Sequence, residues 1–162
     1  MHHKRSFRRK LQTFFLSLLL VLLTVAEVPS AAYTAEAASA DTTMAVHFLD
    51  VGQGLSILVQ SQGQNLLYDG GDRGHSSFVV SYLQKQNISI IDYMISSHYD
   101  EDHVAGLVGC LDSFSVKNVI GADYIQDTKI YQSFENSVAS QGLTVQHPEP
   151  GTDFTFGGGK FT

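Results

Sequence analysis

The chain has 162 residues, a formal net charge of −6 and a single cysteine. The surplus of acidic side chains excludes the broad basic surface on which most nucleic-acid-binding domains depend. A single cysteine excludes an intramolecular disulfide, and Cys110 lies among apolar residues, so we expect it to pack in the core rather than act as a nucleophile.

Residues 1–40 carry the pattern of an export signal. Five Lys and Arg residues fall within the first ten positions, and an apolar run at 11–28 follows them. An Ala-rich tract comes next, in which residues 38–40 fit a small-x-small cleavage site. We therefore expect a secreted domain, or one on the extracytoplasmic face of the cell envelope, at residues 41–162. The alternative is an uncleaved N-terminal membrane anchor, because the apolar run is only slightly shorter than the roughly 20 residues that span a bilayer.

Removal of the signal would make the remaining domain more acidic. Residues 1–40 hold five basic and two acidic residues, which leaves five basic against 14 acidic residues and a net charge of −9. Bound divalent cations would offset part of this charge locally.

The domain opens with three predicted strands, at 43–50, 55–59 and 65–69. They follow one another closely, and a polar loop at 60–64 joins the last two, so we expect an antiparallel meander. His47 has apolar neighbours in the first strand, and we interpret it as a structural histidine.

Two glycine-containing turns adjoin these strands. Gly52 and Gly54 form a Gly-x-Gly pair with no helix after it, which indicates a tight turn close to the site rather than a phosphate-binding loop. Asp69 ends the third strand, directly before Gly70 and Gly71, and is well placed to support a site at the edge of the sheet.

The remaining elements alternate between helix and strand. In chain order we predict a helix from a Ser76 or Ser77 cap to residue 87, a strand at 90–95, a helix through residue 111, a strand at 116–121, a helix at 128–141, a strand at 143–145 and a hairpin that starts at 154. This alternation favours a layered α/β sheet. The hairpin continues to the last residue, so we expect a C-terminally incomplete domain. We place His75 and His147 in loops, outside the site.

Two histidines and three carboxylates fall within residues 98–103, between the predicted strand and the following helix. A turn at this point allows His98, Asp100, Asp102 and His103 to converge, which neighbours on a straight strand or helix cannot do. Asp102 also suits the cap of the helix. The alternative is an acidic capping turn with ordinary polar histidines, but a cap needs one carboxylate and no histidine. The pattern therefore indicates a metal site.

Three segments, at 48–54, 68–71 and 97–107, together resemble the metallo-β-lactamase-fold hydrolases. They are most similar to the branch found in ComEC-type competence proteins, which take up DNA, and their standalone secreted relatives. The resemblance covers residues 44–162 and implies an α/β (α+β) fold, a four-layer αβ/βα sandwich of which this chain supplies the N-terminal half.

The resemblance implies a divalent metal site, with Zn or Mn and up to two ions in a complete site. The superfamily pattern at the central turn is His-x-His-x-Asp-His. His98 would bind the first metal, with Asp100 where the second histidine usually lies. Asp102 and His103 would bind the second metal, and Asp102 would also orient a metal-bound hydroxide. Asp100 in place of histidine makes the site richer in oxygen and admits manganese as well as zinc.

The resemblance also implies residues that support the site without binding metal. Asp69 matches the supporting aspartate of the family's first sequence motif, and Asp50, Gly52 and Gly54 belong to the glycine turn. Leu55 departs from the family pattern, which often has an acidic residue there. The later bridging aspartate and the C-terminal histidine of the family would lie beyond Thr162.

These features predict a secreted metal-dependent hydrolase, phosphodiesterase-like or nuclease-like. Its substrate would be a phosphodiester, single-stranded DNA included, a choice that comes from the resemblance alone. No protein partner can be inferred. Two alternatives stay open: a non-catalytic or truncated metal-binding module, and a hydrolase of a small ester or lactam, which suits the acidic surface better.

Overall fold

The computed structural model describes residues 43–162, which lie within one compact unit. The expected signal segment at residues 1–40 lies outside the described residues. None of the helices between residues 43 and 162 has both the length and the apolar character that a membrane span requires.

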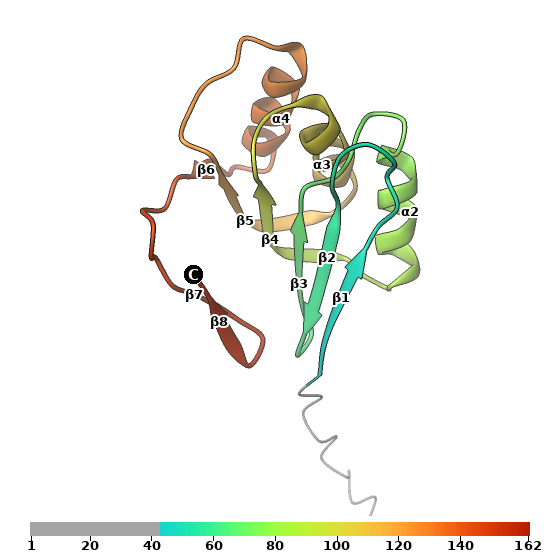
Figure 1. Cartoon of the computed structure of the whole chain (residues 1–162), viewed down its shortest axis with the longest axis vertical. Coiled ribbons are helices and arrows are strands. Elements are labelled where there is room, and N and C mark those ends of the chain that lie inside the picture. Colours follow the sequence, from blue (N-terminus) through green and yellow to red (C-terminus); the bar gives the residue numbers. More distant parts are fainter. Residues whose placement is uncertain (1–42) are drawn as a thin grey trace, which may run out of the picture. The chain divides into compact units, whose positions relative to one another are not determined.

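A six-stranded mixed sheet forms the centre of the fold, in the order β1-β2-β3-β4-β5-β6 (Figure 1). Strands β1 to β3 are antiparallel neighbours, and β3 to β6 are parallel. The strands are β1 Met44–Phe48, β2 Ile57–Ser61, β3 Gln64–Tyr68, β4 Ile90–Ser96, β5 Ser115–Gly121 and β6 Val145–Gln146. The predicted meander and the helix-strand alternation after it are both confirmed.

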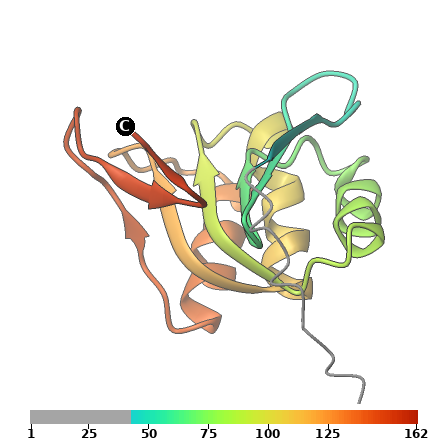
Figure 2. The same cartoon turned by 90° about the horizontal axis from the view of Figure 1, so that it is seen from below.

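Three helices connect the parallel strands and cover one face of the sheet (Figures 1 and 2). They are α2 Ser76–Lys85, α3 Glu101–Ser113 and α4 Lys129–Ser140. Parallel strands need such crossover connections, whereas the antiparallel strands β2 and β3 are joined by a tight turn. This is the α/β layering that the sequence predicts.

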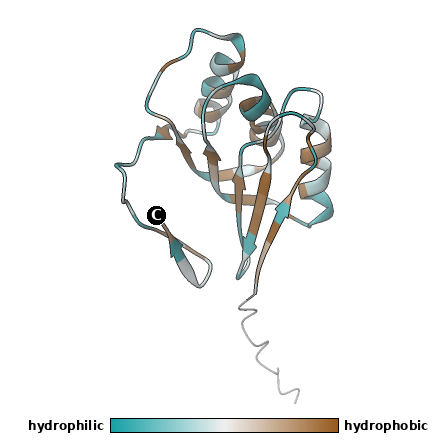
Figure 3. Cartoon of the chain, viewed as in Figure 1, coloured by the Kyte–Doolittle hydropathy of each residue, from teal (hydrophilic) through white to brown (hydrophobic). Residues whose placement is uncertain are grey.

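A row of fully buried side chains crosses the sheet beneath the helices. Leu58, Leu67, Met94 and Val119 are register partners on four neighbouring strands, and none is exposed to solvent. They belong to one core cluster with the buried faces of the helices, which Figure 3 shows as hydrophobic colouring along the strands. Burial of each such side chain contributes about 1.5 to 3 kcal/mol to the stability of the fold.

A small hairpin of β7 Phe154–Phe156 and β8 Gly159–Phe161 packs on the opposite face of the sheet. The ring of Tyr93 lies edge-on to those of Phe154 and Phe161, with centroids 6.0 and 5.3 Å away. Because neighbouring strand residues point to opposite faces, Tyr93 faces away from the helices that cover Met94. The hairpin therefore begins a second layer on this face.

Among the described residues, nothing covers the β1 end of this second face. Met44, Val46 and Phe48 alternate along β1 and are 59%, 48% and 76% exposed. This is the face on which the four-layer sandwich would place its other sheet.

The β2–β3 hairpin differs from its prediction in register. The expected strand at 55–59 is observed at Ile57–Ser61, and the expected loop at 60–64 shortens to a two-residue turn. Gln62 and Gly63 form this turn, both with positive φ, at 48° and 76°. Such a turn matches the twist of the flanking strands, so the polar residues beside it continue the ladder instead of forming a loop.

The start of α3 also differs. We predicted Asp102 as the helix cap, but the helix begins at Glu101 with Asp100 in the cap position and no side-chain capping bond. Asp102 lies inside the first turn, where its charge still interacts favourably with the helix dipole. In α4 the predicted start holds, because the Thr128 side chain accepts a hydrogen bond from the Tyr131 amide.

Backbone contacts without intervening side chains join the end of β3 to the first turns of α3. The Gly70 amide donates to the His103 carbonyl (2.7 Å), and the Gly106 amide donates to the Gly71 carbonyl (3.0 Å). A Cβ on Gly70 would overlap the Leu107 amide, and one on Gly106 would overlap the Gly70 carbonyl. Glycine at both positions thus fixes the distance between β3 and α3.

Substitution of Gly106 by alanine should destabilise the domain by roughly 3 kcal/mol, because its methyl group would meet backbone that cannot rotate away. Urea unfolding measures this loss. Gly109→Ala is the matched control in the same helix. Its Cβ would overlap only the Ser76 hydroxyl, which can rotate away, and would make ordinary contacts with Ser76 Cβ and Val80. Alanine also favours the helix by up to about 1 kcal/mol. Equal unfolding midpoints for the two variants would contradict the packing described.

Burial raises the pKa of the Cys110 thiol to about 12. A thiol reagent at about pH 8 should therefore react with Cys110 only as fast as the domain unfolds, and fully in denaturant. The free thiol ionises near pH 8.5, so this residue's contribution to stability is lost as pH rises above about 8.5. Rapid labelling of the native protein would contradict the core position.

Candidate metal centre

The turn after β4 brings three of the predicted ligands together. His98, Asp102 and His103 each offer a ligand atom, and these atoms lie within 4.8 Å of one another. The two imidazole rings are 3.9 Å apart between centroids, and His103 Nε2 is 3.8 Å from Asp102 Oδ2. His103 and Asp102 lie in the first turn of α3, whereas His98 precedes the helix. The change of direction at the strand end therefore produces the convergence.

A buried carboxylate behind the cluster orients both imidazoles. Asp69 has no exposed surface, and its Oδ2 accepts from His103 Nδ1 (2.8 Å) and from the Ser97 hydroxyl (2.6 Å). The Ser97 amide donates to the other oxygen at 2.8 Å. The Ser97 hydroxyl in turn lies 2.9 Å from His98 Nδ1, from which it can accept. One carboxylate thus reaches His103 directly and His98 through a serine.

This hydrogen-bond network assigns the same tautomer to both rings. A proton on Nδ1 of each imidazole satisfies Asp69 and Ser97, which leaves both Nε2 atoms with a free lone pair. Metal-binding histidines in proteins show this arrangement, with the second nitrogen held by a carboxylate or a hydroxyl relay. Nothing in the sequence singled out Ser97 beyond its place next to His98.

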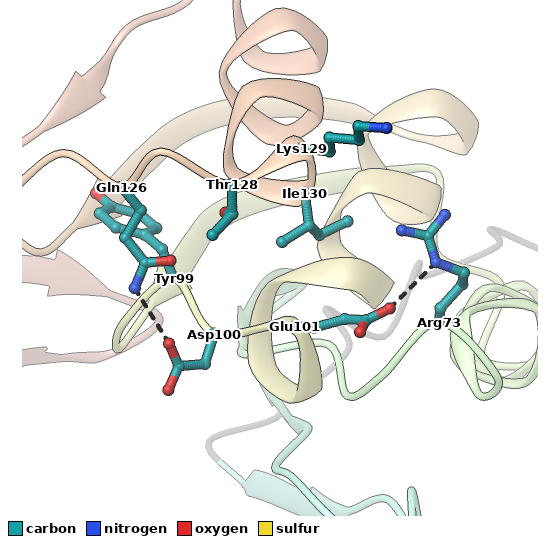
Figure 4. Close-up of a pocket in the computed structure, with 8 residues that line it drawn as sticks. All are labelled: Arg73, Tyr99, Asp100, Glu101, Gln126, Thr128, Lys129 and Ile130. Atoms are coloured by element: carbon teal, nitrogen blue, oxygen red, sulfur yellow. Dashed lines mark hydrogen bonds and ion pairs between the residues drawn. The ribbon is translucent and has the colours of Figure 1, made fainter.

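Asp100 lies at the edge of the cluster. Its Oδ2 is 3.6 Å from His98 Nε2, but its Oδ1 accepts from Gln126 Nε2 at 3.1 Å (Figure 4), and its side chain is 62% exposed. It is therefore outside the set of three ligand atoms that already converge. Gln126 comes from the loop before α4, and no sequence pattern connects it to the central turn.

The glycine turn after β1 lies against the backbone of Asp102. The Asp50 side chain accepts from the Gly52 amide (3.3 Å), which stabilises the turn, and a Cβ on Gly54 would overlap the Asp102 carbonyl. Gln53 Nε2 lies 3.5 Å from Asp102 Oδ2. Asp50, Gly52 and Gly54 therefore shape one wall of the cluster and contribute no converging ligand atom.

Two further histidines lie outside the cluster. His47 Nδ1 is 2.8 Å from the Tyr82 hydroxyl, which agrees with a structural role. His75 is half-buried and occupies the N-cap position of α2, where we expected Ser76 or Ser77. Its Nδ1 is 2.7 Å from Asp72 Oδ1, which also accepts a hydrogen bond from the His75 amide at 2.9 Å. These two hydrogen bonds lower the pKa of the Asp72 carboxyl. His75 thus lies in the turn before α2, as predicted, and is paired with Asp72.

The donor set fits a divalent transition metal. Two imidazole nitrogens and a carboxylate oxygen are the ligands that zinc takes in hydrolytic sites, and manganese accepts the same set with more oxygen. The cluster is partly open, since the His98 and Asp102 side chains are 36% and 31% exposed. Room therefore remains for further ligands or a substrate.

The architecture and the cluster together define a family. The model of the metallo-beta-lactamase superfamily matches residues 49–159, which include both glycine turns and the central turn. The chain belongs to the metallo-beta-lactamase superfamily.

Named relatives place the chain further within this superfamily. It is 39% identical over 77 residues to "Recombination protein 2" of Haemophilus influenzae, and 36% identical over 63 residues to "Competence protein ComA" of Neisseria gonorrhoeae. These matches cover 44% and 38% of this chain, and it spans only about a tenth of either relative (10% and 9%). The resemblance to competence proteins of the ComEC type that the sequence indicates is thus confirmed.

Solved structures agree with the fold. A metallo-β-lactamase of Cronobacter sakazakii superposes with a TM-score of 0.51 at 15% identity, over 70% of this chain and 46% of that one. At this identity the likeness shows the fold alone.

Asp69→Asn should lower the affinity for zinc by about 10- to 100-fold, because His103 would lose the carboxylate that fixes its tautomer. Competition with a chromophoric chelator measures this change. Asp112→Asn, at the exposed end of α3, removes the same charge and should leave the affinity unchanged. Ser97→Ala, which breaks only the relay to His98, should give an intermediate loss. Equal affinities in all variants would show that Asp69 has no supporting role.

Proposed function

We propose that this chain provides metal ligands and the water-orienting carboxylate of a metal-dependent hydrolase that cleaves phosphodiesters, single-stranded DNA among them. The observation that carries the proposal is the network from Asp69 to His103, and through Ser97 to His98. It presents two Nε2 atoms beside the Asp102 carboxylate. A purely structural turn has no use for two oriented imidazoles facing one another.

The chain's own residues would perform distinct steps. His98 and His103 would hold the metal through Nε2. Asp69 keeps the Nδ1 proton of His103 in place, and Ser97 keeps that of His98 in place. A divalent metal held by these residues would supply Lewis-acid chemistry, which lowers the pKa of water from 15.7 to about 7. Asp102 orients the attacking water through its second oxygen and accepts the proton. The Gly52 to Gly54 turn positions Asp102 by its contact with the helix backbone.

The choice of a phosphodiester rests on the relatives. Their printed names concern recombination and competence, and DNA is the common substrate of both processes. The export-signal pattern of residues 1–40 supports action outside the cytoplasm, where incoming DNA would be met.

A second candidate is hydrolysis of a small ester or lactam. The net charge of −9 for residues 41–162 favours it, because a strongly acidic surface repels a polyanion. The two candidates share the metal centre and differ only in the substrate that enters it.

Hydrolysis of bis-(p-nitrophenyl) phosphate, a single-stranded oligonucleotide and nitrocefin by the full-length protein, with Zn or Mn supplied, tests the proposal. We expect turnover of both phosphodiesters. Asp102→Asn should reduce kcat about 100-fold or more, since the carboxylate that takes the proton is lost, and Asp112→Asn should retain full activity.

Three outcomes would contradict the proposal. Turnover of nitrocefin alone would favour the second candidate. Metal uptake without turnover of any substrate would identify a non-catalytic metal-binding module. Full activity of Asp102→Asn would exclude this carboxylate from the chemistry.

A further inference from the structure

A cavity of about 340 Å³ lies beside the metal cluster, between the amino ends of α3 and α4 (Figure 4). Asp100 forms part of its wall and is also the neighbour of His98 Nε2, at 3.6 Å. The cavity and the cluster are therefore adjacent. A substrate that reached the cluster along this side would pass Asp100 and enter the cavity.

Cationic side chains gather at this cavity although the domain is acidic. Residues 43–162 contain only five Lys and Arg residues, and two of them, Arg73 and Lys129, line the cavity. Figure 4 shows the Arg73 guanidinium and the Lys129 side chain on the same side of it. Lys117 and Lys160, in contrast, are held by Asp92 and Asp153 elsewhere.

Both cations keep donors for a ligand. Lys129 is exposed and has no ion pair or side-chain hydrogen bond among the described residues. Arg73 uses only Nε to contact Glu101, at 3.1 Å, which leaves its two terminal NH₂ groups available. A guanidinium fork and an ammonium at one cavity wall match the oxygens of a phosphate.

One oxygen of each carboxylate at the same cavity is engaged. Glu101 accepts from Arg73, and Asp100 accepts from Gln126 on the opposite wall (Figure 4). Ile130 adds an apolar surface between the two walls. The formal charges of the two cations and the two carboxylates at the cavity sum to zero, and the NH₂ groups of Arg73 and the ammonium of Lys129 remain as charged donors for an anionic ligand.

We propose that this cavity binds the phosphate next to the scissile one in a single-stranded oligonucleotide, with Lys129 and Arg73 as its contacts. The inference rests on the proposed function and deepens it. It makes the enzyme selective for polynucleotides over isolated phosphodiesters, because an isolated diester has no second phosphate to place in the cavity.

The first test compares two substrates. The kcat/KM of the full-length protein is measured for a thymidine hexanucleotide and for bis-(p-nitrophenyl) phosphate at several salt concentrations. Lys129→Ala should lower the ratio of the two values about fivefold, the effect of one exposed ion pair, and Arg73→Ala should lower it further. Loss of one phosphate contact should also reduce the slope of log kcat/KM against log salt concentration, measured on the hexanucleotide, by about 0.7.

Lys85→Ala is the matched control, because Lys85 is an exposed lysine in the last turn of α2, outside the cavity lining. It removes the same charge and should leave the ratio unchanged. An unchanged ratio in Lys129→Ala and Arg73→Ala, with both substrates cleaved, overturns this inference alone. Failure of the wild-type chain to cleave either substrate overturns the proposed function, and this inference with it.

The second test does not depend on turnover. A thymidine trinucleotide with a 5′-phosphate is titrated into the ¹⁵N-labelled, metal-free chain, and amide shifts are followed by NMR. Shifts at residues 126–130 and 73 that disappear in Lys129→Ala support the cavity. Shifts confined to other parts of the domain overturn it.

Discussion

The buried carboxylate of Asp69 is the interaction on which the site depends. It lies at the end of β3 without solvent exposure, and its oxygens accept from Ser97 and His103. Its φ of 55° places it in the left-handed region, which costs a non-glycine residue about 1 to 3 kcal/mol. The hydrogen bonds that it receives offset this cost and couple the strand end to both imidazoles.

Backbone packing makes that coupling geometrically possible. Gly70 and Gly106 allow β3 and α3 to approach until their peptide groups are in contact, and Gly54 does the same for the turn that lies on Asp102. Any side chain at these positions would push α3, and with it Asp102 and His103, away from Asp69. The glycines in the family-like segments of the sequence therefore allow close backbone contact. The position of the metal ligands depends on these backbone contacts as well as on the polar side chains.

Much of this arrangement could be predicted from the sequence, because the relevant signals are local. Apolar periodicity located the helices and strands within a few residues, and the density of imidazoles and carboxylates at 98–103 located the cluster. Two kinds of feature escaped prediction. The register of the β2–β3 hairpin depends on the two-residue turn Gln62-Gly63, which lacks the Asn-Gly or Asp-Gly pair that marks such turns in a sequence. Ser97 bonds to Asp69, and Gln126 bonds to Asp100 at the edge of the cluster; such tertiary hydrogen bonds leave no periodic pattern in the sequence.

The central claim is that His98, Asp102 and His103 bind a divalent metal as one centre. Elemental analysis of the purified full-length chain, after incubation with Zn or Mn and dialysis, tests it most directly when paired with a His98→Ala, His103→Ala double variant. We expect about one to two ions per wild-type chain, thermal stability that falls on addition of a chelator, and neither property in the double variant. Equal metal content in both proteins, or negligible metal in the wild-type chain, would contradict it.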